Sequence, residues 1–89
     1  MRAVISVIGK DMVGILAKVS TKCAESGMNI TDVTQSVLQD MFVMVMMVEI
    51  TEKSKPFADF SKEMSEMGKE CGLDIRVMHE DIFNTMHQV

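Results

Sequence analysis

The run QDMFVMVMMVEI, residues 39–50, decides the fold that this sequence predicts. Apolar side chains occupy both the odd and the even positions of the run. A strand with one face in water alternates apolar and polar residues, so this run indicates a strand that is buried on both faces. Gln39 and Asp40 form a short polar break before it, which indicates a hairpin with the preceding run NITDVTQSVLQ that begins at Asn29.

A strand and a helix precede this hairpin. The run AVISVI, residues 3–8, is short and rich in β-branched residues, which is typical of a buried strand, and we expect Gly9 to end it. Over residues 12–26 the apolar positions follow the i, i+3, i+4 spacing of one helix face. We expect Asp11 to cap the start of this helix, and Gly27 to follow its last turn.

A second helix, a fourth strand and a tail follow the hairpin. Pro56 opens the helix, where a proline costs no hydrogen bond, and Gly72 closes it. The run LDIRVMH, residues 73–79, alternates as a half-buried strand does. The tail has a short helix-like pattern that would be marginal alone, so it should dock on an apolar surface. The apolar positions are Phe57, Phe60, Met64, Met67 and Cys71 in the helix and Ile82, Phe83, Met86 and Val89 in the tail.

The order strand, helix, strand, strand, helix, strand predicts an α+β, ferredoxin-like βαββαβ sandwich. This plan has a four-stranded antiparallel sheet with two helices on one face, here followed by a short C-terminal helical tail. We assign residues 1–80 to one domain and residues 81–89 to a tail that packs on the sheet or on a partner subunit. Since the helices leave one sheet face bare, an apolar set from residues 39–50 must lie there. We expect the tail, a second subunit, or both to cover it.

The length, charge and composition of the chain limit the kinds of partner that it can bind. Its 89 residues make one domain, which buries a modest share of its surface and would gain stability from a partner. The net charge is −4 and no basic cluster is present, which argues against nucleic acid and anionic membranes as partners. The first apolar run is too short for a signal peptide or a membrane span. Cys23 and Cys71 lie in helical patterns rather than in a Cys-x-x-Cys pair, which favours reduced thiols and a cytoplasmic location.

Residues for catalysis or metal binding are sparse. His79 and His87 stand near the C-terminus without a nucleophile or an orienting group beside them, so no catalytic residue is predicted. The eleven methionines fall mostly on periodic apolar positions, which favours packing over a soft-metal site. An RNA-recognition module would need paired aromatic residues on its central strands, where this chain has Phe42 alone. We expect no enzyme activity, no metal and no cofactor.

Two short motifs resemble the ACT domain, a small ligand-binding module that regulates amino-acid metabolism. They are GKDMVGIL, residues 9–16, and ESGMNITD, residues 25–32. With the βαββαβ order, the resemblance covers essentially the whole chain. It is strongest to the stand-alone ACT-domain proteins of an uncharacterised prokaryotic family, related to the glycine cleavage system repressor, through the GKD..GI start and the IF..MH ending at residues 82–87.

The resemblance implies an amino-acid site at the interface of a homodimer. The helix start of one subunit would face the beginning of the second strand of its partner, and amides near Val13 and Gly14 would hold an α-carboxylate. Asp11 would bind an α-amino group or cap the helix. The implied ligand-binding residues are Asp11, Met12, Val13 and Gly14, with Asn29 and Ile30 of the partner subunit.

An alternative without a ligand stays open for the same residues. Asp11 as an ordinary helix cap and Gly14 as a packing glycine would need no bound molecule. Many amino-acid-binding members of the family also carry proline just before the motif glycine, where this chain has Val13.

The predicted function is that of a non-catalytic, cytoplasmic regulatory module. It would form a homodimer or a higher homo-oligomer, bind an amino acid or a similar small metabolite, and act through an unknown partner protein. Two alternatives are a protein–protein interaction module without a small ligand, which works through the apolar sheet face, and a transcriptional regulator of the glycine-cleavage-repressor type.

Overall fold

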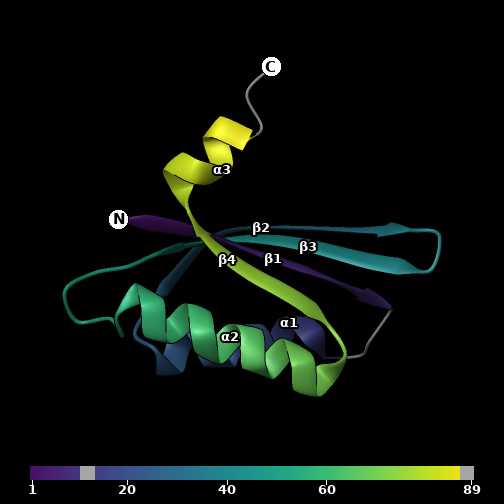
Figure 1. Cartoon of the computed structure of the whole chain (residues 1–89), viewed down its shortest axis with the longest axis horizontal. Helices are drawn as coiled ribbons and strands as arrows, with labels where there is room; N and C mark the ends of the chain where they lie inside the picture. Colours follow the sequence, from purple (N-terminus) through teal and green to yellow (C-terminus); the bar gives the residue numbers. More distant parts are fainter. Residues whose placement is uncertain (11–13, 87–89) are drawn as a thin grey trace.

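The computed structural model describes residues 1–10 and 14–86 of the chain. Their strands form one antiparallel sheet in the spatial order β2-β3-β1-β4. Helices α1 and α2 lie together on one face of the sheet, and α3 rises on the other side (Figure 1). The predicted ferredoxin-like βαββαβ sandwich with a short C-terminal helix is thereby confirmed. The elements are β1 (Arg2–Lys10), α1 (Ile15–Glu25), β2 (Asn29–Leu38), β3 (Met41–Glu49), α2 (Phe57–Cys71), β4 (Asp74–His79) and α3 (Glu80–Met86).

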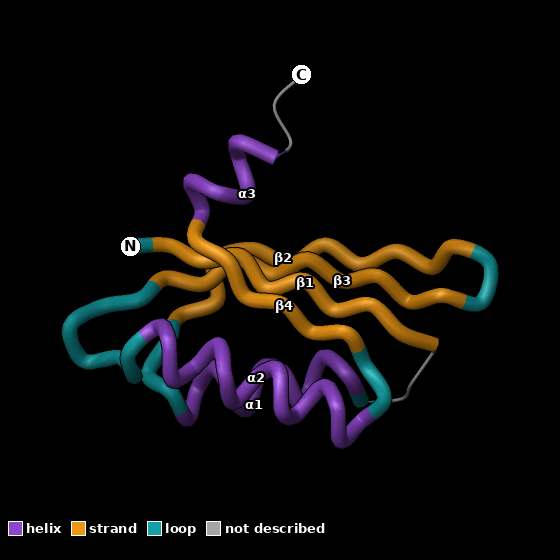
Figure 2. The backbone as a smooth tube through the Cα atoms, viewed as in Figure 1, coloured by secondary structure: helices purple, strands orange, loops and turns teal. Residues whose placement is uncertain are grey.

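The core fills the space between the sheet and the two long helices, which Figure 2 shows as separate layers. Apolar residues recur every fourth position along α1, and in α2 Phe60 and Met64 are fully buried. Full burial of a side chain such as Phe60 stabilises the fold by about 1.5–3 kcal/mol. The predicted helix faces are correct at these positions, because their spacing matches the turn of the helix, whereas Leu16, which the spacing also placed on the apolar face, is 38% exposed. The fully buried core residues facing the helices are Ala3, Ile5, Val7, Met44, Met46 and Val48 from the sheet and Cys23 from α1.

The two faces of β3 differ in how well the chain covers them. Met44, Met46 and Val48 face the helices and are wholly buried, as predicted. On the opposite face Met41 is 39% exposed, and the other apolar side chains of that parity are half-buried. The described residues therefore bury the helix-facing side of β3 more fully than the other side, where the sequence predicted burial on both.

Strand β1 and helix α1 correct two predicted boundaries. Strand β1 continues to Lys10, so Gly9 lies inside the strand instead of ending it. A side chain at Gly9 would collide with the side chain of Leu73, which explains the glycine by close packing. Helix α1 begins at Ile15 and its N-cap is Gly14, whereas the sequence predicted Asp11 as the cap.

The predicted turns are confirmed. Gln39 and Asp40 form the tight turn between β2 and β3, and Gln39 has the positive φ of 58° that such turns require. Gly27 follows α1 with a φ of 74°, and Gly72 closes α2 with a φ of 73°. Both glycines therefore end their helices in the left-handed conformation that the sequence predicted.

An ion-pair network joins the helix layer. The carboxylate of Glu63 in α2 forms an ion pair with the ammonium of Lys22 in α1 at 2.7 Å. It forms a second ion pair with the ammonium of Lys55 at 2.6 Å. These hydrogen bonds, first that from Lys22 and then that from Lys55, lower the pKa of Glu63 to about 2. The hydrogen bond to Glu63 in turn raises the pKa of Lys22. The network holds α1, α2 and the loop before α2 in register.

Candidate functional site

Gly14 opens α1 with an unusual backbone conformation. Its φ is +84°, in the left-handed region that side-chain-bearing residues adopt only with strain. The residue is exposed, and a Cβ placed on it would meet no atom of the described residues within 4 Å. Among these residues Gly14 is thus not a packing glycine, and its backbone conformation explains why glycine stands there.

The amino end of α1 presents backbone amides that make no hydrogen bond within the helix itself. The first helical hydrogen bond is the one that the amide of Lys18 donates to the carbonyl of Gly14 at 3.0 Å. The amides before it have no partner within the helix, and Gly14 has no side chain to accept from them. The first turn of α1 itself contains no acidic residue, so no carboxylate within that turn offsets the partial positive charge of the helix end. Such an end is suited to a carboxylate.

The remaining predicted residues of this loop lie outside the part of the chain that the structure describes. They are Asp11, Met12 and Val13. Their proposed contacts with an amino acid stay predictions from the sequence.

Asn29 and Ile30 begin β2, which is an edge strand of the sheet. Both side chains are exposed, Ile30 by 38%. The hydroxyl of Thr31 donates to the carbonyl of Met47 at 3.2 Å, and the pairing register shifts between Ile30 and Asp32. Within the described residues no further strand pairs with the outer edge of β2.

The two halves of the predicted site lie at opposite ends of one sheet. Lys10, which precedes the first loop, pairs with Met41, whereas Asn29 pairs with Glu49 at the other end of β3. Eight residues of extended strand separate Met41 from Glu49, a distance of about 26 Å at about 3.3 Å per residue. The chain therefore does not bring Gly14 and Asn29 together by itself.

Other groups of the described residues do not form a reactive centre. No cluster of three His, Cys, Asp or Glu side chains is placed to hold a metal there. The ring Nδ1 of His79 accepts the amide of Asp81 at 3.1 Å, which places His79 at the start of α3 as a capping group. Cys23 and Cys71 are free thiols, and burial raises the pKa of Cys23 to about 11. The helices of the described part are all too short or too polar to cross a membrane.

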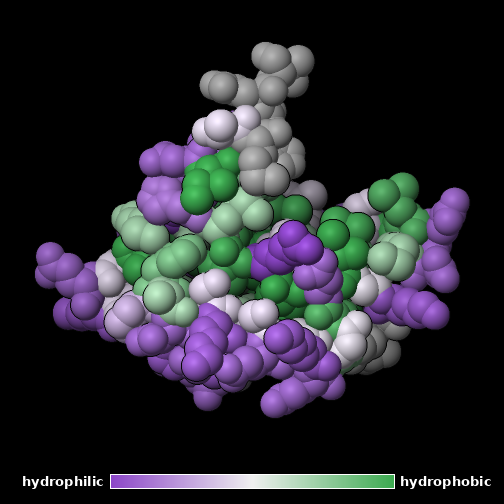
Figure 3. All heavy atoms as spheres, viewed as in Figure 1, coloured by the Kyte–Doolittle hydropathy of each residue, from purple (hydrophilic) through white to green (hydrophobic). Residues whose placement is uncertain are grey.

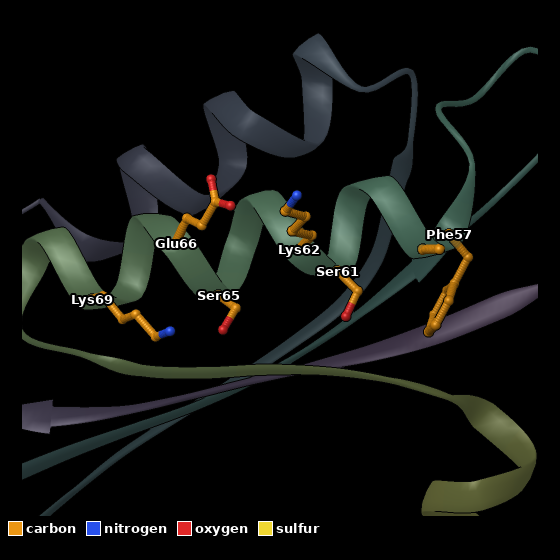
Figure 4. Close-up of a pocket in the computed structure, with 7 residues that line it drawn as sticks. Phe57, Ser61, Lys62, Ser65, Glu66 and Lys69 are labelled. Carbon is orange, nitrogen blue, oxygen red and sulfur yellow. The ribbon is translucent and has the colours of Figure 1, made fainter.

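A shallow pocket on α2 also carries no site. Its lining comes from α2 alone (Figure 4). Phe57, Ser61 and Ser65 point to one side of the helix, whereas Lys62 and Glu66 point to the other side. The polar groups do not converge on one point, so the pocket lacks the arrangement that recognises a ligand.

Comparison with known proteins identifies the family of the chain. The sequence pattern of the ACT domain family matches residues 2–78. Two relatives are a UPF0237 protein of Listeria innocua, 45% identical over all 89 residues of both chains, and a UPF0237 protein of Methanocaldococcus jannaschii, 42% identical over 99% of this chain and 98% of the other. The chain belongs to the UPF0237 family of ACT-domain proteins.

Solved structures show the same fold. An ACT domain protein from Streptococcus pneumoniae superposes with a TM-score of 0.82, at 37% identity over 93% of each chain. A protein provisionally described as a glycine cleavage system transcriptional repressor superposes with a TM-score of 0.73 over 89% of this chain and 47% of the other. At 19% identity, this second likeness shows the fold alone.

The sequence reasoning missed that Gly14 itself begins the helix. A usable signal was present, because glycine stands directly before the regular apolar spacing of Ile15 and Val19. Residue preferences at helix starts favour an aspartate side chain over glycine, which is why the sequence predicts Asp11 as the cap.

Proposed function

We propose that the protein is a non-catalytic regulatory module of the cytoplasm that binds an amino acid, or a similar small metabolite, between two copies of itself. The observation that carries this proposal is the placement of Gly14 and Asn29 at opposite ends of a sheet whose edge strand β2 is free. The ligand state of the site would then be passed to a partner protein.

Pairing of two β2 edges would assemble the site. In an antiparallel pair of identical strands, Asn29 of the partner subunit comes to the Leu38 end of this chain's β2. Leu38 pairs with Met41, and Met41 pairs with Lys10. The start of the partner's β2 would therefore arrive at the end of the sheet from which the chain enters α1. That is the relative placement that a shared site requires.

The chemistry of this assembled site suits an α-amino acid. The free amides at the start of α1 would bind the carboxylate, because the helix end carries partial positive charge. Asp11 would bind the α-amino group through its carboxylate, and Asn29 of the partner subunit would add a side-chain amide. The exposed side chain of Ile30 on the partner would lie beside the ligand's apolar part.

Thermal shift against the twenty amino acids tests the proposal. A ligand at one hundred times its dissociation constant stabilises the folded state by about 2.7 kcal/mol, which raises the melting temperature of a domain this small by roughly 10 °C or more. Gly14→Ala and Asn29→Ala should abolish this rise.

Matched controls separate binding from folding. Gly72 has the same left-handed backbone and equally open surroundings, but it lies in the turn between α2 and β4, so Gly72→Ala should retain the rise. Asn84 is an exposed residue of α3, and Asn84→Ala should also retain it. If no amino acid raises the melting temperature of the parent protein, the proposal fails.

A further inference from the structure

The sheet face turned away from α1 and α2, here called the open face, has an apolar centre and polar margins. The pairing register assigns residues to this face, because side chains of directly paired residues lie on the same side. Edge strand β2 contributes Asp32, Thr34 and Ser36 and ends with Leu38, and edge strand β4 contributes Asp74 and Arg76 and, near its end, Met78. The central strands contribute the apolar residues Val4, Ile8, Met41, Val43, Val45 and Met47, together with the polar residues Ser6 and Lys10.

This composition differs from that of a sheet face that water covers. A solvated face of an antiparallel sheet is mainly polar. Here Ile8 is 37% exposed and Met41 39% exposed, although both lie on central strands. An apolar centre with a polar rim is the usual composition of a protein interface. Figure 3 shows the contrast with the outer surface of the helix layer, which is hydrophilic.

Helix α3 covers only one end of the open face. The guanidinium of Arg2 donates two hydrogen bonds to the carboxylate of Glu80, at 2.9 and 2.5 Å, and so fixes the start of α3. At this end Val4 is wholly buried. Ile82 on α3 is itself 55% exposed. Helix α3 therefore lies over one end of the open face and leaves the rest of that face uncovered by the helix (Figure 1).

We propose that a second copy of this chain covers the open face, with the two sheets stacked face to face about a two-fold axis that runs across the strands. This axis exchanges the two ends of the sheet. The α3 helix of each copy then lies beside the hairpin end of the other, where Leu38 is 65% exposed and Met41 is 39% exposed. An axis along the strands would instead bring both α3 helices to the same end and leave the hairpin ends bare.

The size of the open face fits a stable pair of identical subunits. The strands have 9, 10, 9 and 6 residues and lie about 4.8 Å apart at about 3.3 Å per residue, so the sheet covers roughly 540 Å² in flat projection. The accessible area of a surface with side chains exceeds its projection, and each α3 adds its own flank. A specific interface buries about 800 Å² on each partner, so the open face with α3 is of the required size.

This contact is distinct from the edge pairing of the proposed function and does not rest on it. One uses the outer edge of β2, and the other uses the side chains of the open face. Both contacts together give a tetramer of four 10.0 kDa chains, or about 40 kDa, in which two eight-stranded sheets stack.

Sedimentation equilibrium and light scattering at about 1–100 µM, which detect association with dissociation constants in that range, test the proposal with Val45→Lys. The substitution places a charge at the centre of the open face, and it should convert the tetramer into a dimer. Ser65→Lys adds the same charge to the exposed surface of α2 and should leave the tetramer intact. Val45→Thr keeps the β-branched shape and the fold, so if Val45→Lys fails to fold, Val45→Thr should still weaken association by about tenfold or more.

The outcomes distinguish this contact from the edge contact. A parent dimer that becomes monomeric in Val45→Lys supports the face contact and removes the edge dimer of the proposed function. If the parent protein is a dimer or tetramer and neither Val45 variant changes its mass, the face contact is overturned. The proposed function then still stands. A parent protein that is monomeric throughout the concentration range overturns both.

Discussion

Replacement of Gly14 by alanine should destabilise the protein by about 1 kcal/mol, through the backbone alone. An L-residue in the left-handed region costs about 1–2 kcal/mol, and the lower entropy of alanine in the unfolded chain offsets this only in part. The φ of +84° supplies this cost, and steric contact adds nothing, because a Cβ at Gly14 would meet no described atom within 4 Å. For a domain of this size, 1 kcal/mol lowers the melting temperature by about 4–8 °C.

Urea denaturation followed by circular dichroism measures this change. Gly72→Ala is the comparison, since Gly72 has a φ of +73° and equally open surroundings. The two variants should lose similar stability with unchanged dependence on urea concentration. A loss at Gly14 several times larger than at Gly72 would show that the Cβ meets a neighbour after all. No loss at Gly14 would show that its φ is not positive in solution. Either result would refute the reasoning.

Three further predictions concern the core, the helix layer and the thiols. Phe60→Ala should cost about 3–5 kcal/mol in urea denaturation, because Phe60 is completely buried. Glu63 has a lowered pKa, so its ion pairs stabilise the fold above pH 4.5 and this stabilisation is lost as the pH falls toward about 2. Melting curves of Glu63→Gln should therefore lack that part of the acid dependence. A thiol reagent at neutral pH should label half-buried Cys71 and leave Cys23 unlabelled, since Cys23 is buried and burial raises its pKa to about 11; labelling of both at equal rates would contradict the packing of α1.

The fold could be predicted from the sequence because the apolar residues of each helix or strand recur at the spacing that is typical of that element. The four-residue spacing of Ile15, Val19 and Cys23 belongs to a helix, and the polar break at Gln39 and Asp40 separates two strands of a hairpin. These patterns depend on neighbours along the chain, which a single sequence displays. The order of the elements then left few topologies to consider.

The candidate site was harder to predict from the sequence, because the positions of its residues depend on strand pairing and backbone angles as well as on local sequence pattern. The sequence identified Gly14 and Asn29, but only the pairing register reveals that about 26 Å of strand separates the two ends where they lie. Capping by Gly14 depends on a backbone angle, whereas residue preferences favour a side chain such as that of Asp11. The apolar set on the second face of β3 was visible in the sequence, but its degree of exposure depends on where α3 lies.

The outer edge of β2, which pairs with no other strand of the described residues, affects how a monomer of this protein behaves. This strand is ten residues long, contains neither proline nor lysine, and carries one charged side chain, Asp32. Proteins usually protect such an edge with those residues, because an unprotected edge recruits strands from any chain nearby. A single copy with this edge unpaired would therefore be prone to aggregate, and pairing of the edge with a second copy would remove that tendency.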